Sequence, residues 1–446
     1  MAGKATVEGH IQIAILSVGA IASLAIFRYL RLPAWCSLLL LTAVAARGLR
    51  DLLGLPEIAD FLHYPVVLLF ALAAADRPTR AASRAPGRWL SIFFLVVLLS
   101  AIAHPDVPTR AALFLLIAGE PLVVMWAIAR WGADESTVHT VGLVAVLLAV
   151  IQIPIGVYQG LSYGWSDPVQ GTLQGHGAGS HILGALFALV LFVVIAALLA
   201  RRIDLVMGGA YAAICFGMML AASSLSVLVI AAFAAVLEPL TAPSRHYHIV
   251  RRSGRLTTVV LALVLGASVL VVVGALFGGF YERAASLATS TSQPGVEIVR
   301  EQATSDPLAL LLGSGPGTSA SRASLLLADA KPDSPLEFIG LEPTDLGIEL
   351  RAATSQEVYG GSVESAASSV LGVAGDLGAV GLVALGMLFV AMWKRAGSST
   401  SWLAPAGRAG LLMAAALSVI DNWLEYPEFA IPFAILIGFV LSDAQE

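Results

Sequence analysis

The sequence predicts an all-α protein that crosses a membrane many times, and three observations predict it. Of the 446 residues, 58% are hydrophobic. Only 12% are charged, whereas soluble domains carry about 25% charged residues. Apolar stretches near the length of a bilayer-crossing helix, about 20 residues, recur from one end of the chain to the other. The chain is therefore expected to form a helical bundle of about 12 to 13 spans.

The apolar stretches define the expected spans in order. They cover residues 11–30, 33–46, 57–75, 89–104, 110–130, 137–159, 181–200, 203–221, 225–241, 256–279, 367–392, 404–420 and 429–443. The stretch 33–46 is short for a bilayer core of about 30 Å, so a re-entrant segment is the alternative there.

Arginine and lysine clusters predict the orientation, because short cytoplasmic loops of membrane proteins are enriched in both residues. The clusters are Arg77, Arg80, Arg84 and Arg88; Arg201 and Arg202; Arg245, Arg251, Arg252 and Arg255; and Lys394 with Arg395. Counting spans between them places all four on one side, which we assign to the cytoplasm. The N-terminal side stays open, because basic residues lie on both sides of the doubtful span.

Residues 280–366 form the main departure from the apolar pattern. The segment holds twelve acidic and five basic residues, and no stretch of it is apolar enough to span. It divides the chain into a first bundle at 1–279, an external segment at 280–366 and C-terminal spans at 367–446. A segment of this length is expected to be functional. Short helices are expected near 296–305, 321–330 and 344–353, forming a cap over the bundle.

Three short motifs follow one another along the chain. The first is Gly156 and Gln159 at the end of a span, followed by Gly171 and Thr172 in a turn. The second is "DPLALLLGSGPG" at 306–317, where glycines and a proline end an apolar run that cannot continue as a helix. The third is Asp376, Gly378 and Gly381 in a later span.

In this order and spacing, the motifs resemble the O-antigen ligase and polymerase superfamily of bacterial membrane glycosyltransferases. The resemblance covers about 156–381. It implies a GT-C-like bundle in the bacterial cytoplasmic membrane with its active site facing outward. Such enzymes take a glycan from an undecaprenyl-pyrophosphate carrier and transfer it to a hydroxyl of a glycan or lipid acceptor. No metal, no other cofactor and no nucleic acid is implied, and the lipid bilayer is the remaining partner.

The resemblance and the chemistry of phosphate recognition select the candidate site residues. Arginine binds phosphate oxygens through two N–H groups at once and stays charged. The candidate substrate-binding residues are Arg300, Arg322, Arg283, His176 and Gln159. The candidate catalytic residues are Glu364 and His181, because a carboxylate or an imidazole can accept a proton from an acceptor hydroxyl. A cavity is expected near 159, 181, 364 and 425.

Three of these candidates, and two other ionisable residues, also have a structural interpretation. Arg300 lies beside Glu297 and Glu301 and can form a surface salt bridge. Arg283 can anchor the end of a span, and Glu364 can cap a helix. Asp376 is interpreted as a buried structural partner. Glu120, in the middle of a span, is interpreted as a packed polar group beside Pro121 rather than a proton relay.

The chain departs from the family pattern at several positions. Ser223 and Ser224 stand where ligases carry a Ser-Arg step, the loop 160–180 has no arginine, and no histidine stands near Ala367. Polymerase and ligase activities therefore both stay open. A membrane transporter or flippase is the alternative class, although the single large loop and the lack of an evident inverted repeat favour the enzyme.

Overall fold

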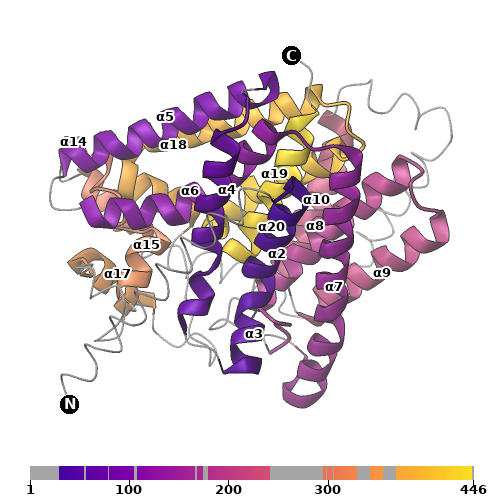
Figure 1. The fold of residues 1–446 in the computed structure, drawn as a ribbon. Helices are drawn as coiled ribbons and strands as arrows, with labels where there is room; N and C mark the ends of the chain where they lie inside the picture. Colours follow the sequence, from indigo (N-terminus) through magenta and orange to yellow (C-terminus); the bar gives the residue numbers. More distant parts are fainter. Residues whose placement is uncertain are drawn as a thin grey trace, which may run out of the picture.

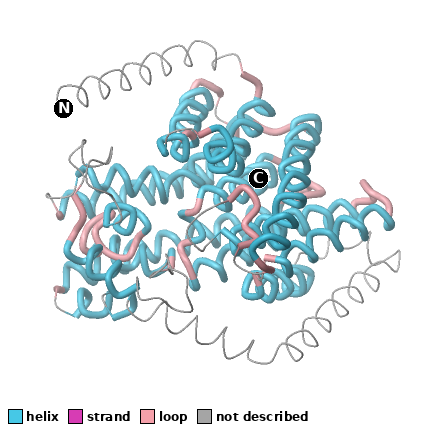
Figure 2. The backbone as a smooth tube through the Cα atoms, turned by 90° about the horizontal axis from the view of Figure 1, so that it is seen from below, coloured by secondary structure: helices cyan, strands magenta, loops and turns pink. Residues whose placement is uncertain are grey.

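The computed structural model describes most of the chain as packed helices. The described residues are 30–54, 57–78, 80–104, 108–165, 168–173, 179–222, 224–241, 295–297, 299–304, 306–328, 342–354 and 368–443. Figures 1 and 2 show an all-helical bundle in this part of the chain. Six of its helices are long and apolar enough to cross a membrane, and five shorter apolar helices accompany them. The predicted all-α membrane fold is confirmed at this level.

The helices of the bundle follow the predicted apolar stretches. They are α2 (Leu32–Leu40), continued by a π-helical turn (Leu41–Ala45) and α3 (Ala46–Leu53), then α4 (His63–Ala75), α5 (Ala81–Ala103), α6 (Pro108–Trp131), α7 (Glu135–Tyr163), α8 (Gly179–Leu199), α9 (Leu205–Ala221), α10 (Leu225–Thr241), α18 (Ser369–Ser398), α19 (Ala404–Ile420) and α20 (Pro427–Ser442). Two 3₁₀ turns, η2 (Glu57–Phe61) and η3 (Trp423–Glu425), precede α4 and α20. The predicted spans 11–30 and 256–279 lie outside the described residues.

The stretch 33–46 belongs to a helix that is longer than its apolar run, while the re-entrant alternative stays a prediction. Residues Leu32–Asp51 form a 20-residue apolar stretch of continuous helix. The sequence pattern underestimated its length because α3 is amphipathic, so its polar residues interrupted the apolar run. Trp35 packs against Phe70, with ring centroids 5.5 Å apart, while Arg47 lies near Asp60 at the start of α4. Helix α2–α3 therefore runs antiparallel to α4.

The predicted basic turns that the structure describes gather at one end of the bundle, while the cluster from Arg245 to Arg255 lies outside the described residues. Arg130 donates from Nε to the carbonyl of Ala74 over 2.7 Å, and the Arg77 guanidinium lies 4.4 Å from the Trp131 ring centre. Arg202 pairs with Glu135 between the starts of α9 and α7. The common position of these turns agrees with the predicted orientation, while their assignment to the cytoplasm stays a prediction. We call this the basic end.

Short helices form within the predicted external segment, close to where they were expected. They are α14 (Pro307–Leu312), α15 (Arg322–Ala328) and α17 (Asp345–Thr354), and residues 295–297 and 299–304 are also helical. In Figure 1 these helices gather beside α5, α6 and α18. Ala323 and Leu327 of α15 are buried in one cluster with Phe93 and Ile117 of the spans. The described part of 280–366 is thus packed into the bundle rather than forming a separate domain.

The "GSGPG" turn crosses α18 at a break in that helix. Gly378 has φ +64° and ψ −160° inside α18, which interrupts the helical hydrogen bonds. Gly313 has φ +72°, and a Cβ there would overlap the backbone of Asp376. Ser314 donates its backbone N–H to the carbonyl of Gly375 over 2.8 Å. Two glycines therefore let the turn and the span approach backbone to backbone.

Asp376 holds this crossing together. Its Oδ2 accepts the backbone N–H of Gly317 at 2.6 Å, and its Oδ1 accepts that of Ser319 at 2.8 Å. The carboxylate is fully buried. The hydroxyl of Ser100 on α5 lies 2.7 Å from the carbonyl of Leu312, on the other side of the turn. Asp376 thus has the structural role that the sequence predicted, and it positions the chain that leads into Arg322.

Candidate functional site

A polar cavity of about 60 Å³ lies where α3, η2, α4, α15 and α20 meet. Its polar lining consists of Thr42, Arg47, Asp60, His63, Tyr64, Arg322 and Glu428. In a chain with only 12% charged residues, such a cluster inside the bundle is exceptional. Polar and ionisable groups within membrane proteins are costly to bury and most often functional.

The cavity lies well inside the bundle. Its neighbour Glu120 is twelve residues from the start of α6, from 108 to 120, which is about 18 Å along the helix at 1.5 Å per residue. His63 and Glu428 belong to the first turns of α4 and α20, whose starts lie away from the basic end. The cavity is therefore recessed below the ends of the longer helices.

Arg322 reaches the cavity because two groups of the α19–α20 connection hold it. Its backbone N–H donates to Oε2 of Glu425 over 2.6 Å. Its guanidinium lies 4.3 Å from the ring centre of Tyr426, which is a cation–π contact. The start of α15 is therefore clamped to the start of α20, and the arginine side chain is directed along this junction.

Arg47 lies between two carboxylates on the other side of the cavity. Its Nε is 3.6 Å from Oδ2 of Asp60, and its Nη1 is 3.6 Å from Oε1 of Glu428. Arg50, one turn further along α3, also pairs with Asp60. The cavity thus combines arginines with carboxylates instead of being uniformly positive.

Several buried polar atoms around the cavity have no hydrogen-bond partner among the described residues. They are both ring nitrogens of His63, Oε1 of Glu120, Oε2 of Glu428 and Oδ1 of Asp60. The side chains of His63, Glu120 and Glu428 are only 3% to 4% exposed. A buried polar group without a partner costs about 1–3 kcal/mol. Such a concentration of unsatisfied atoms is typical of a site that binds water or a polar ligand.

Glu425 lies in the turn η3, outside the spanning helices, and its surroundings change its pKa strongly. Burial raises the pKa of Glu425 to about 8, although the N–H of Arg322 and its positive charge act in the opposite direction. The nearby Asp376 and Asp421 also raise this pKa. Near neutral pH, both the neutral and the charged forms of Glu425 are therefore populated.

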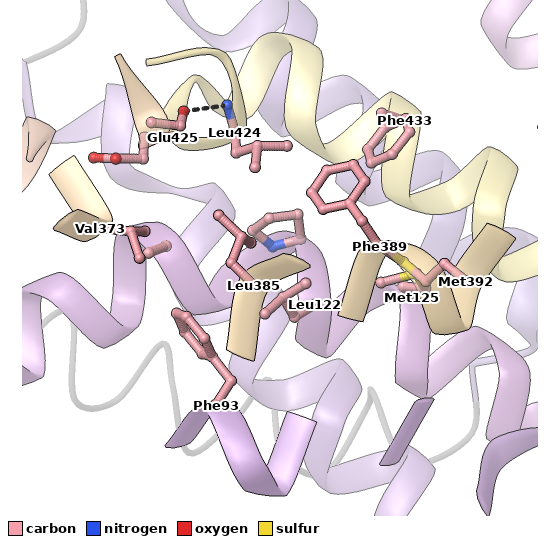
Figure 3. A pocket seen from close by; sticks show the side chains of 13 residues that line it. Phe93, Leu122, Met125, Val373, Leu385, Phe389, Met392, Leu424, Glu425 and Phe433 are labelled. Atoms are coloured by element: carbon pink, nitrogen blue, oxygen red, sulfur yellow. Dashed lines mark hydrogen bonds between the residues drawn. The ribbon is translucent and has the colours of Figure 1, made fainter. Parts of the chain in front are cut away.

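A second cavity, of about 30 Å³, extends from Glu425 into the apolar interior. Figure 3 shows it surrounded by Phe93, Leu385, Phe389 and Phe433. The dashed line in the figure is the hydrogen bond from the backbone N–H of Leu424 to the Ser369 hydroxyl, 3.2 Å long. Nothing in this lining except Glu425 is ionisable, so the cavity is a gap in apolar packing.

The structure brings one predicted site residue, Arg322, to the polar cavity. Arg300 is exposed on its helix and does not line the cavity. His181 lies in the first turn of α8, with its Nδ1 buried and unpartnered, but it does not line the cavity either. The sequence analysis expected the cavity to lie near residues 159 and 181. Neither residue lines it. Arg283, His176 and Glu364 lie outside the described residues.

Gln159 holds a loop to the bundle. Its Oε1 accepts the backbone N–H groups of Gln170 and Gly171 at 2.9 and 2.7 Å, and its Nε2 donates to the Gly171 carbonyl at 2.9 Å. Gln152, two turns earlier on α7, binds the backbone N–H and the hydroxyl of Thr172 in the same way. Gln159 therefore fixes the loop at 170–171 to α7, and its role in substrate binding stays a prediction.

Sequence reasoning missed most residues of the cavity. Arg47 was considered only as one of the basic residues beside the doubtful span 33–46, and Glu120 only as a packed polar group. His63 and Glu428 were not selected at all. A usable signal was the presence of ionisable residues at the edges of apolar stretches, because such residues are rare in membrane spans.

Comparison with protein-family models found no family that matches the chain. A comparison with curated proteins likewise found no match.

Proposed function

We propose that this protein is a glycosyltransferase of the bacterial cytoplasmic membrane that uses a polyprenyl-diphosphate-linked glycan as its donor. The acceptor is a hydroxyl of a second glycan or of a lipid, so both polymerisation and ligation fit. In this proposal the bundle is GT-C-like, and the polar cavity opens toward the outer face, opposite the basic end.

The observation that carries the proposal is the convergence of Arg47 and Arg322 on one recessed polar cavity. The two arginines come from α3 and α15, which lie far apart in the sequence. Two guanidinium groups beside a membrane interior suit a diphosphate whose lipid tail stays in the bilayer. Arg47, which faces Asp60 and Glu428, would exchange these carboxylates for the donor phosphates or keep them as groups that orient its guanidinium.

The reaction needs little beyond positioning and charge. The bond between the anomeric carbon and the diphosphate oxygen breaks, and its electron pair leaves with the lipid diphosphate. The acceptor oxygen forms a new bond to the anomeric carbon and loses its proton to a base. Arginines placed at the departing diphosphate stabilise the charge that develops there. With a volume of about 60 Å³, the cavity holds a reacting group rather than a whole sugar, so the glycan lies outside it.

The test uses purified protein in lipid vesicles with a polyprenyl-diphosphate-linked glycan as donor. Wild-type protein is expected to release polyprenyl diphosphate and a longer or transferred glycan in equal amounts. Arg322→Ala is expected to lower the rate by about 30- to 1,000-fold, because one charge-assisted contact in the transition state is worth roughly 2–4 kcal/mol. Arg322→Lys is not expected to rescue it, since an ammonium cannot bind two phosphate oxygens in one plane.

Arg84→Ala is the matched control, because Arg84 is an exposed arginine of α5 near the basic end. It is expected to keep wild-type activity. Loss of activity in Arg300→Ala together with full activity in Arg322→Ala would move the diphosphate site to the helix at 299–304. Absence of transfer by the wild-type protein with every acceptor tried would reject the enzyme.

Buried ionisable residues inside the bundle favour a second candidate, a membrane transporter or flippase. Arg408 of α19 and Glu238 of α10 form a buried ion pair with Nε and Oε1 3.2 Å apart, and Glu120 is buried in α6. Such residues also occur on ion and proton pathways. Transport predicts movement of the lipid-linked glycan across vesicles without bond cleavage and with a dependence on a proton gradient. Glycosyl transfer predicts cleavage with no such dependence.

A further inference from the structure

His63 and Glu120 form a pair whose geometry is unusual for structural residues. Nε2 of His63 lies 3.6 Å from Oε2 of Glu120, and both side chains are almost completely buried. The other polar atoms of the pair, Nδ1 of His63 and Oε1 of Glu120, have no hydrogen-bond partner among the described residues. A purely structural pair would be expected to satisfy these atoms.

The position of the pair relative to the arginines gives it a chemical context. His63 lines the same cavity as Arg47, Arg322 and Glu428, while Glu120 lies behind His63 on α6. His63 is further held by Tyr64, with ring centroids 4.1 Å apart. An imidazole directed by a carboxylate is the usual arrangement for accepting a proton, with one ring nitrogen facing the carboxylate and the other facing the reactant.

The unsatisfied atoms indicate the chemistry of a group that could bind them. They include carboxylate oxygens, which accept hydrogen bonds, and imidazole nitrogens, which either donate or accept. A hydroxyl group both donates and accepts, and a cavity of about 60 Å³ accommodates one hydroxyl-bearing carbon or a few water molecules. An alcohol hydroxyl therefore suits these atoms, because it can donate to a carboxylate oxygen and exchange a proton with an imidazole nitrogen.

From this arrangement we infer that His63 is the catalytic base that accepts the proton of the acceptor hydroxyl, and that Glu120 is the residue that positions its ring. The inference rests on the proposed glycosyl transfer. In the step, the acceptor O–H bond breaks and the proton moves to Nδ1 of His63, while Nε2–H is directed at Glu120. The acceptor oxygen bonds to the anomeric carbon, the lipid diphosphate leaves with its electron pair, and the imidazolium later returns the proton to water.

The first experiment measures transfer and donor binding by His63→Gln in lipid vesicles. Glutamine retains a polar side chain but cannot carry the proton. The expected result is a fall of about 100- to 10,000-fold in kcat, the usual contribution of general base catalysis. The KM for the polyprenyl-diphosphate donor should stay within about twofold of the wild-type value, because the arginines are intact. His139→Gln is the control, since His139 is exposed on α7, and it should behave as wild type.

A second experiment separates catalysis from folding. His63→Ala leaves a space of imidazole size, and added imidazole is expected to restore part of the lost kcat. Glu120→Asp should retain more activity than Glu120→Gln, with the difference in kcat rather than in donor KM, as expected for a positioning carboxylate. Thermal unfolding of each variant reports any loss of the fold.

The outcomes distinguish the inference from the proposed function. Transfer by the wild type with undiminished kcat in His63→Gln would overturn the role of His63 and leave the glycosyltransferase standing. A loss without imidazole rescue, accompanied by lower thermal stability or weaker donor binding, would make His63 structural. Absence of transfer by the wild type itself would reject the proposed function, and the inference with it.

Discussion

Replacing Asp376 by asparagine tests how the segment that carries Arg322 is held in the bundle. Both carboxylate oxygens of Asp376 accept backbone N–H groups, from Gly317 and Ser319. An asparagine side chain has only one oxygen, so its NH₂ group would face one of these two donors. The substitution keeps the size of the side chain and changes only this polarity.

The expected cost follows from the number of hydrogen bonds lost. One buried N–H left without a partner costs about 1–3 kcal/mol. With a cost of about 2 kcal/mol, the population in which residues 313–321 open locally increases about 30-fold, since 1.4 kcal/mol corresponds to a factor of ten. Misplacement of Arg322 in the open form should also lower transfer activity.

Hydrogen–deuterium exchange of the purified protein measures this opening directly. Peptides covering 313–321 should exchange about 30-fold faster in Asp376→Asn than in wild type, while peptides of α8 should not change. Asp306→Asn is the matched control, because Asp306 is an exposed N-cap that accepts from Leu308, and asparagine caps a helix equally well. Unchanged exchange in Asp376→Asn would mean that other contacts hold the turn, and the reasoning would be refuted.

Two further predictions concern the same region. Gly378→Ala should lower the thermal-unfolding temperature, because a Cβ there would lie 2.5 Å from the Leu311 carbonyl carbon at a φ of +64°. Gly142→Ala is the control in the same thermal-unfolding assay, and it should be neutral because its Cβ meets open space. Burial raises the pKa of Glu425 to about 8 from its ordinary value of 4.5, so folding favours its neutral form. The stability that this group contributes is fully present below about pH 4.5 and is lost as the pH rises through about 8. Glu425→Gln should therefore flatten the fall in thermal stability between pH 4.5 and 8, and an unchanged slope would assign that fall to other groups.

The apolar pattern of the sequence predicted the helical bundle well, for a physical reason. A backbone in hydrocarbon must satisfy its own hydrogen bonds, and a helix does so within one segment. Length and hydrophobicity are therefore enough to locate α5, α6, α8 and most other spans. They failed at α2–α3, where the polar residues of α3 interrupt the apolar run although the helix continues.

The candidate site was predictable only in part. Arg322 was selected because it follows a recognisable turn in an otherwise apolar chain, and it lines the cavity. From the sequence, the turn itself was expected only to end an apolar run. The structure instead packs it against α18, where Gly313 and Gly378 allow close approach. No local pattern could reveal this contact, since it joins segments more than sixty residues apart, from 313 to 378.

The sequence by itself determined that this chain forms apolar helices long enough to cross a membrane, and it predicted the common end at which its described basic turns lie. Both properties follow from hydrophobicity and charge summed over single segments. Only the tertiary structure decided that Arg47, His63, Arg322 and Glu428 face one cavity. Their helices approach because α3, α4, α15 and α20 pack against one another, and such packing depends on the shapes of many side chains at once. Polar groups from different helices meet inside the bundle only when the chain is packed. The hydropathy of a single segment therefore cannot predict which of them meet.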